Sequence, residues 1–111
     1  MSAETKPAAT RLYVAGPMTG LTDFNYPAFN RAAALLRGLG YEVENPAEND
    51  ACGSWAVYLR ASLAQVVRCD GLALLPGWEA SRGARLEVHV ADALGMEIAS
   101  VDSWADRLAL A

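Results

Sequence analysis

The sequence has few of the residues that metal sites and disulfide frameworks require. It contains one histidine, His89, and two cysteines, Cys52 and Cys69, whose spacing is not that of metal ligands. Cys69 begins an apolar segment and is expected to be a small buried hydrophobe, whereas nothing marks Cys52, in a loop, as reactive. We therefore expect neither a metal nor another cofactor, and a reducing, cytoplasmic setting.

Runs of basic residues and long apolar stretches are also missing. The nine lysines and arginines are scattered and the net charge is −4, which argues against binding to duplex nucleic acid or to an anionic membrane. No stretch is long enough to span a bilayer. Residues 1–10 are polar and alanine-rich, so we expect a flexible N-terminal segment and not a signal peptide. A small phosphorylated ligand is compatible with this charge balance.

Length and composition favour one folded domain, which we place at residues 11–111. With 53% hydrophobic and 20% charged residues, 111 residues suffice for one core but not for two. Strand-like and helix-like stretches alternate, which predicts a Rossmann-like or flavodoxin-like α/β three-layer sandwich with a mainly parallel sheet of about four strands. The expected strands are 12–15, 41–44, 72–75 and 96–99, and the expected helices are 27–39, 55–67, 81–94 and 103–110.

The most informative segment runs from Cys69 to Glu87. It reads as a buried strand, a loop and the start of a helix. Ser81 is a good N-cap, and Gly83 in the first turn lets a ligand approach the main chain. A helix N-terminus binds anions, and Glu87 lies one turn further along, about 6 Å from Gly83 on the same face. The segment is therefore typical of a nucleotide site with a carboxylate aimed at the glycosidic bond.

Glu87 also has an ordinary interpretation, because most helical glutamates lie on solvated faces and pair with Lys or Arg one turn away. The residues three and four positions from it are Gly83, Ala84, Val90 and Ala91, which offer no such partner. A carboxylate among small side chains at the edge of a buried face leaves room for a ligand, so the pattern favours the functional interpretation.

A second glycine-containing loop follows the first expected strand. Gly16 and Gly20 surround Pro17 and Met18 and give a tight loop whose main chain can approach a substrate. The loop is neither a dinucleotide-binding fingerprint nor a Walker loop, since their spacing and the GK[ST] ending are absent. In parallel sheets ligands bind beyond the carboxyl ends of the strands, where we expect this loop and the one after Leu75 to converge.

With both elements in hand, the chain resembles the nucleoside 2-deoxyribosyltransferase-like superfamily over residues 11–99. Its branch is common in phage and bacterial genomes and is usually described as a domain of unknown function. The matching motifs are Tyr13-x-x-Gly16-Pro17-Met18, Asn45-Pro46 and Ser81-x-Gly83-x-x-x-Glu87.

The resemblance implies roles for these residues. Glu87 matches the nucleophile that attacks the anomeric carbon, and Tyr13 matches the tyrosine that orients it. Serine at the Ser81 position is typical of members that hydrolyse nucleoside 5′-monophosphates and contacts the phosphate. The resemblance thus implies an N-glycosidase or deoxyribosyltransferase that takes a nucleotide or nucleoside, and a homo-oligomer, dimeric or larger, in which a neighbour completes the site. Gly16, Pro17, Met18 and Gly83 are the further expected substrate-binding residues.

Other side chains near these motifs have two possible roles each. Trp78 is a candidate for stacking on the base, or for packing or an oligomer contact. Arg82 is a candidate for neutralising the phosphate, or for solvated surface. Trp55 and Trp104 are assigned to the core or an interface.

One departure concerns leaving-group protonation. Members of the superfamily often carry an aspartate, eight residues before the strand's own aspartate, where this chain has Ser62. Loss of an acid costs typically about 10²–10⁴-fold in rate. Glu79 or Asp50 would have to substitute for it. Ser62 therefore keeps two alternatives open, a nucleotide-binding module without turnover and a purely structural or partner-binding domain.

Overall fold

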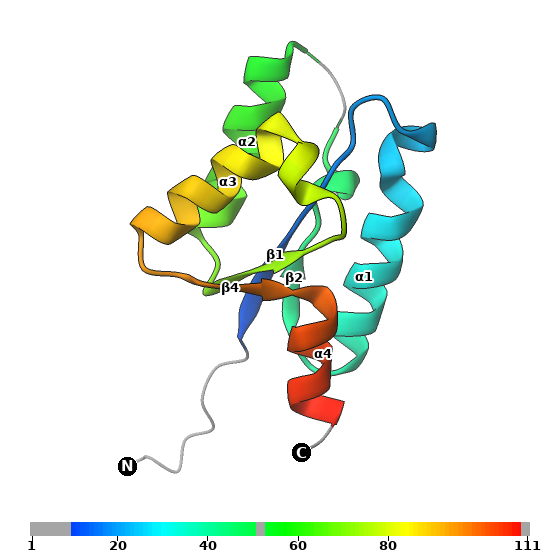
Figure 1. Cartoon of the computed structure of the whole chain (residues 1–111), viewed down its shortest axis with the longest axis vertical. Coiled ribbons are helices and arrows are strands. Elements are labelled where there is room, and N and C mark those ends of the chain that lie inside the picture. Colours follow the sequence, from blue (N-terminus) through cyan, green and yellow to red (C-terminus); the bar gives the residue numbers. More distant parts are fainter. Residues whose placement is uncertain (1–9, 51–52, 110–111) are drawn as a thin grey trace.

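The computed structural model describes residues 10–50 and 53–109, so that Cys52 and most of the expected N-terminal segment lie outside the described residues. Strands and helices alternate along the chain, as predicted (Figure 1). The strands are β1 (Arg11–Ala15), β2 (Glu42–Glu44), β3 (Gly71–Leu74) and β4 (Glu97–Ser100). The helices are α1 (Tyr26–Gly38), α2 (Trp55–Val67), α3 (Arg82–Ala93) and α4 (Val101–Ala109), with short 3₁₀ turns at Thr22–Asn25, Pro46–Glu48 and Trp78–Ala80.

All four strands are parallel, in the order β2-β1-β3-β4. Helices α1 and α4 pack together on one face of the sheet, and α2 and α3 pack together on the other (Figure 1). This is the predicted flavodoxin-like three-layer sandwich. The chain reverses its direction across the sheet at β1 and β3, so the loops that follow these two strands flank the crevice where such folds bind ligands.

Strand β1 separates two apolar layers. Leu12 and Val14 belong to the core beneath α1 and α4, whereas Tyr13 and Ala15 belong to the core beneath α2 and α3. This alternation follows from the pleat of a strand that is covered on both faces. Tyr13 thus brings a phenol hydroxyl into the layer between the sheet and the two helices whose first turns lie at the carboxyl edge.

The N-caps of α2 and α3 fix where these helices begin. The Ser54 hydroxyl accepts a hydrogen bond from the main-chain N–H of Val57, and the Ser81 hydroxyl accepts one from Ala84, each at 3.2 Å. Both caps agree with the predicted helix starts. The predicted start of the last helix was wrong by two residues, because α4 begins at Val101 and the Ser100 hydroxyl accepts a hydrogen bond from the Ser103 N–H at 3.0 Å.

Trp104 attaches α4 to the sheet. Its indole N–H donates to the main-chain carbonyl of Leu72 at 2.7 Å, and its ring meets the ring of Tyr41 edge to face. The Tyr41 hydroxyl in turn donates to the main-chain carbonyl of Trp104 at 2.8 Å. A side chain at Gly71 would lie 2.7 Å from the indole, so the glycine makes room for the ring. The expectation that Trp104 belongs to the core is confirmed.

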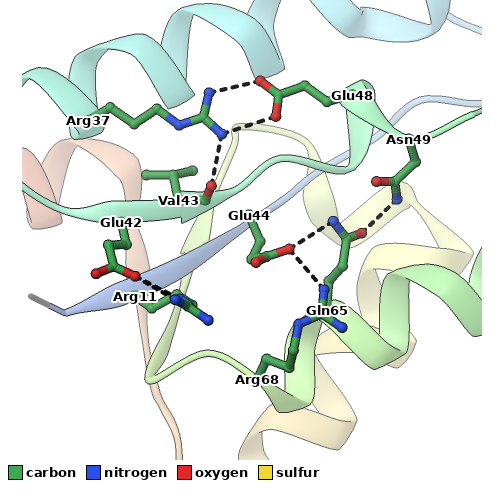
Figure 2. Close-up of polar contacts among 9 residues, drawn as sticks. All are labelled: Arg11, Arg37, Glu42, Val43, Glu44, Glu48, Asn49, Gln65 and Arg68. Carbon is green, nitrogen blue, oxygen red and sulfur yellow. Dashed lines mark hydrogen bonds and ion pairs between the residues drawn. The ribbon is translucent and has the colours of Figure 1, made fainter.

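The edge strand β2 is bordered by charged side chains (Figure 2). Arg37 of α1 donates to the main-chain carbonyl of Val43 at 2.8 Å. The ion pairs are Arg11–Glu42, Arg37–Glu48 and Arg68–Glu44, with N···O distances of 2.6, 2.8 and 3.1 Å. Gln65 adds a bond to the Glu44 carboxylate at 3.1 Å and accepts one from Asn49 at 2.6 Å. These contacts tie the edge strand to α1 and α2. Within the described ranges, no helix is both long enough and apolar enough to cross a membrane.

Candidate active site

A cavity of about 220 Å³ opens at the carboxyl edge of the sheet. Its walls come from Tyr13 of β1, from the loop after β1, and from the first turns of α2 and α3. Pro46, from the predicted Asn45-Pro46 motif, also lines it, while the buried Asn45 side chain accepts a bond from the Ala47 N–H at 3.0 Å and holds that turn. Four segments that are distant in the sequence therefore meet at one site.

Glu87 places a buried carboxyl group in the wall of this cavity. It lies one turn into α3, is only 6% exposed, and accepts a hydrogen bond from the Tyr13 hydroxyl at 2.7 Å. Burial raises the pKa of the Glu87 carboxyl to about 7, although the hydroxyls of Tyr13 and Ser62 favour its ionised form. The same burial, together with the nearby charge of Glu87, raises the pKa of Tyr13, which stays a proton donor. Near neutral pH the carboxylate is thus poorly solvated and held in one orientation.

Ser62 faces this pair from α2 and is fully buried. Its hydroxyl proton is donated to the main-chain carbonyl of Leu59 at 3.0 Å, so it reaches Glu87 only when the hydroxyl rotates. Neither carboxylate considered as a substitute acid lies here: Glu79 borders a separate hollow, and the exposed Asp50 does not line the cavity. Among the described residues, Glu87 supplies the only carboxyl group in the cavity wall.

The first turn of α3 forms the wall one turn away from Glu87. Ser81, Gly83 and Ala84 line the cavity there. A methyl group at Gly83 would meet no atom within 4 Å, so this stretch of main chain faces open space. The first N–H groups of a helix have no intrahelical acceptor and lie at its positive end. This wall is suited to an anionic group of a ligand.

Some of the remaining predicted site residues line the cavity, and others lie outside its wall. Gly16 and Met18 line the cavity, and a side chain at Gly16 would lie 2.7 Å from the Cβ of Leu75. Pro17 is not part of the cavity wall; its carbonyl accepts a bond from the Asn25 amide at 3.0 Å. Trp78 borders the separate hollow on the α1 and α4 side of the sheet. No stacking on a ligand in the main cavity is therefore assigned to Trp78.

Arg82 is not part of the cavity wall, but it stacks on Trp55, which is. The guanidinium carbon of Arg82 lies 4.2 Å from the centre of the Trp55 ring, a cation–π contact between the first turns of α3 and α2. Trp55 also lines the cavity and is 43% exposed, so it does not belong to the core, and the other predicted place, an interface, stays a prediction. A tryptophan at the first helical position reaches over the helix end instead of into the layer below.

Aromatic side chains form a further part of the cavity wall, which the sequence pattern did not predict. This aromatic wall consists of Phe24, Tyr26, Trp55 and Tyr58. Part of it is presented by a turn at residues 23–25 with φ values of 53°, 52° and 61°, a left-handed conformation that aromatic side chains rarely adopt. The predicted polar turn at 23–26 gave no sign of this backbone. Tyr58 could have been predicted as a cavity residue, because it precedes Ser62 by four residues and so lies on the same face of the helix.

No group of three or more His, Cys, Asp and Glu side chains within residues 10–50 and 53–109 is placed to hold a metal ion. The chemistry of the cavity, as the described residues define it, is that of one buried carboxylate, several hydroxyls, a helix N-terminus and an aromatic wall. This combination is suited to attack on an electrophilic carbon of a ligand that is anionic at one end and flat at the other.

The fold is that of a known class of enzymes. The chain is similar to a solved structure, the "2-desoxiribosyltransferase from Leishmania mexicana", with a TM-score of 0.66 and 21% sequence identity. The match covers 82% of this chain and 63% of that chain, so the protein spans less than two thirds of its neighbour's length. The predicted likeness to the nucleoside 2-deoxyribosyltransferase-like superfamily is thereby confirmed for the fold.

A family model places the chain more narrowly. The protein belongs to the family described as "Domain of unknown function (DUF4406)", whose model matches residues 10–100. No curated protein matches the chain.

Proposed function

We propose that this protein cleaves the base–sugar bond of a nucleoside or deoxynucleoside 5′-monophosphate, with Glu87 as the nucleophile. The observation that carries the proposal is the buried Glu87–Tyr13 pair in the wall of the cavity, one turn from the start of α3. That turn spans about 6 Å along the helix axis, roughly the distance between a sugar 5′-phosphate and its anomeric carbon. A phosphate held at the helix N-terminus thus places the anomeric carbon beside the carboxylate.

The reaction has two steps. The ionised Glu87 carboxylate forms a bond to the anomeric carbon, the bond from that carbon to the base nitrogen breaks, and its electron pair leaves with the base. Water or a second base then attacks the same carbon and releases the carboxylate, which gives hydrolysis or transfer. The Tyr13 hydroxyl donates a 2.7 Å hydrogen bond to one carboxylate oxygen of Glu87 and leaves the other oxygen free to attack. The same bond orients the carboxylate and stabilises its negative charge.

The phosphate end of the site rests on main-chain groups. Ser81 and Gly83 line the cavity where the first N–H groups of α3 lie, and this helix end favours negative charge. Arg82, which stacks on Trp55 of the cavity wall, adds positive charge beside this turn. Ser81 can cap the helix and contact the phosphate together, since its hydroxyl accepts a hydrogen bond from the Ala84 N–H and retains a proton to donate.

A second candidate function is nucleotide binding without turnover. The observation that favours it is Ser62, which puts a buried hydroxyl where related enzymes often have an acid. Such a module would keep the phosphate wall and the aromatic wall but release no base.

One experiment distinguishes base cleavage from binding without turnover. A panel of nucleoside and deoxynucleoside 5′-monophosphates is incubated with the protein, and free base is measured by chromatography while thermal unfolding is followed with the same ligands. Release of base from at least one nucleotide is the expected result. Thermal stabilisation without any release would support the binding module, and the absence of both would contradict both functions.

Replacing Gly83 by alanine tests the phosphate end. The methyl group stands in open space, so the folded protein is expected to gain up to about 1 kcal/mol from the lost flexibility of glycine in a helix. In the cavity the same methyl group displaces the phosphate, and we expect KM to rise by about 10-fold or more. Gly38→Ala, on the exposed end of α1 and equally free of neighbours, is the matched control. A KM that changes equally in both variants would argue against a phosphate at Gly83.

A further inference from the structure

The cavity wall has two chemically different parts. Small residues and main-chain N–H groups of the first turn of α3 form one part, and the aromatic side chains of Phe24, Tyr26 and Tyr58 form another. Trp55 lies next to the first part, because Arg82 of α3 stacks on its ring. Glu87 lies between α3 and the sheet, one turn from the small-residue part. If the proposed function holds, a ligand whose phosphate lies at α3 has its base at the aromatic wall.

Tyr58 brings a hydrogen-bond donor to the aromatic wall. Its side chain is half-buried, and its hydroxyl donates to the sulfur of Met18 at 3.0 Å, a contact that joins α2 to the loop after β1. A thioether is a weak acceptor, so this bond is readily exchanged for a bond to a nitrogen or oxygen atom of a ligand. Burial, and then the charge of Glu87, raise the pKa of Tyr58, which therefore keeps its proton across the physiological pH range.

The departing base needs such a donor because the cavity wall offers no acid. Ser62 donates its proton to the carbonyl of Leu59, and the one cavity carboxyl of the described residues, Glu87, is engaged as nucleophile. Tyr58 lies one helical turn from Ser62 on the same face of α2, toward the mouth of the cavity. The proposed binding mode, with the phosphate at α3, puts its hydroxyl on the base side of the bond that breaks.

We propose, building on the function proposed above, that Tyr58 is the leaving-group donor of this site. When the bond between the anomeric carbon and the base breaks, the electron pair passes to the base, and the Tyr58 O–H donates a hydrogen bond to the nitrogen or oxygen atom on which the negative charge gathers. Tyr58 keeps its proton throughout. The base takes up a proton from water after it has left, and Glu87 holds the sugar as an ester in the meantime.

The test compares two leaving groups on one sugar phosphate. The first substrate is the best nucleotide of the panel, and the second is the 4-nitrophenyl β-glycoside of the same sugar 5-phosphate, whose leaving group is stable as an anion and needs little help. Tyr58→Phe is expected to lower kcat about 10- to 100-fold for the nucleotide and about threefold or less for the 4-nitrophenyl substrate. The ratio of these two losses is the readout.

Tyr41→Phe is the matched control, because it removes a buried phenol hydroxyl on the other face of the sheet. It is expected to lower the melting temperature and to leave the ratio of the two rates unchanged.

Each other outcome has a distinct meaning. Equal losses on both substrates, or no loss on the nucleotide, would overturn the role of Tyr58 and leave the proposed function standing. Release of 4-nitrophenolate but of no base by the unaltered protein would retain the Glu87 chemistry and also overturn the role of Tyr58. Release of neither by the unaltered protein would overturn the proposed function itself.

Discussion

Replacement of Glu87 by glutamine is expected to abolish base release and, at pH 8, to make the folded protein more stable. The amide has the shape of the carboxyl group and still accepts the hydrogen bond from Tyr13, but it is no nucleophile toward the anomeric carbon. We expect kcat to fall by at least about 10³-fold. In the unaltered protein the rate of base release should rise with pH through about 7, as Glu87 ionises.

The gain in stability follows from the raised pKa of Glu87. Its carboxyl has a pKa of about 7 in the folded protein and an ordinary value of 4.5 in the unfolded chain. Between these values the folded state holds a proton that the unfolded state has lost, so the free energy of unfolding falls as pH rises through this window. Each pKa unit corresponds to about 1.4 kcal/mol, so the raised pKa destabilises the native state at pH 8 by about 3 kcal/mol. A glutamine at position 87 does not ionise, so the variant avoids this destabilisation.

Urea unfolding of both proteins at pH 5 and pH 8 measures this effect. The advantage of Glu87→Gln should be small at pH 5 and largest at pH 8. Glu79→Gln, which removes the same charge outside the cavity, is the matched control and should change neither activity nor the pH dependence. A Glu87→Gln protein that is less stable than the unaltered one at pH 8 would contradict the assignment of a desolvated carboxylate.

The second large effect concerns Trp104. Its replacement by alanine is expected to lower the free energy of unfolding by about 3–5 kcal/mol, because a cavity opens beneath α4 and the Leu72 carbonyl and Tyr41 ring lose their partner. Trp104→Phe keeps an aromatic ring but not the indole N–H, so an intermediate loss is expected. Both values come from urea unfolding curves.

Arg107→Ala serves as the control for Trp104. Arg107 stacks on the outer side of the same indole at 4.0 Å and pairs with Glu97, but it lies in solvent and its loss should have a much smaller effect. If Trp104→Ala and Arg107→Ala destabilised the protein equally, the indole would not be the anchor of α4.

Sequence periodicity was sufficient for most of the fold, for physical reasons that the structure makes plain. The apolar run at 72–75 predicted a strand covered on both faces, and β3 is the neighbour of β1 inside the sheet. Ser54 and Ser81 marked two helix starts because few residues satisfy the first N–H groups of a helix. Ser100 was overlooked as a cap because α4 follows β4 without a loop, so that no turn residues announce the helix.

The candidate site was predictable only in part. Glu87, with small residues at the neighbouring helical positions, pointed to a cavity, and Tyr13 came from the family resemblance; the structure joins them at 2.7 Å. Tyr58 and Met18 are 40 residues apart in the sequence. Their contact depends on how α2 packs against the loop after β1, which local sequence patterns do not predict. The left-handed turn that presents Phe24 depends equally on its surroundings, because its own side chain disfavours that backbone.

The charged border of β2 also decides where copies of this protein can meet. A second copy that extended the sheet at this edge would have to strip water from the ion pairs of Arg11, Arg37 and Arg68 and break the bond from Arg37 to the strand's own carbonyl. Natural sheets discourage edge-to-edge joining in this way. Any symmetric assembly of the protein is therefore expected to leave its β2 edges turned toward solvent.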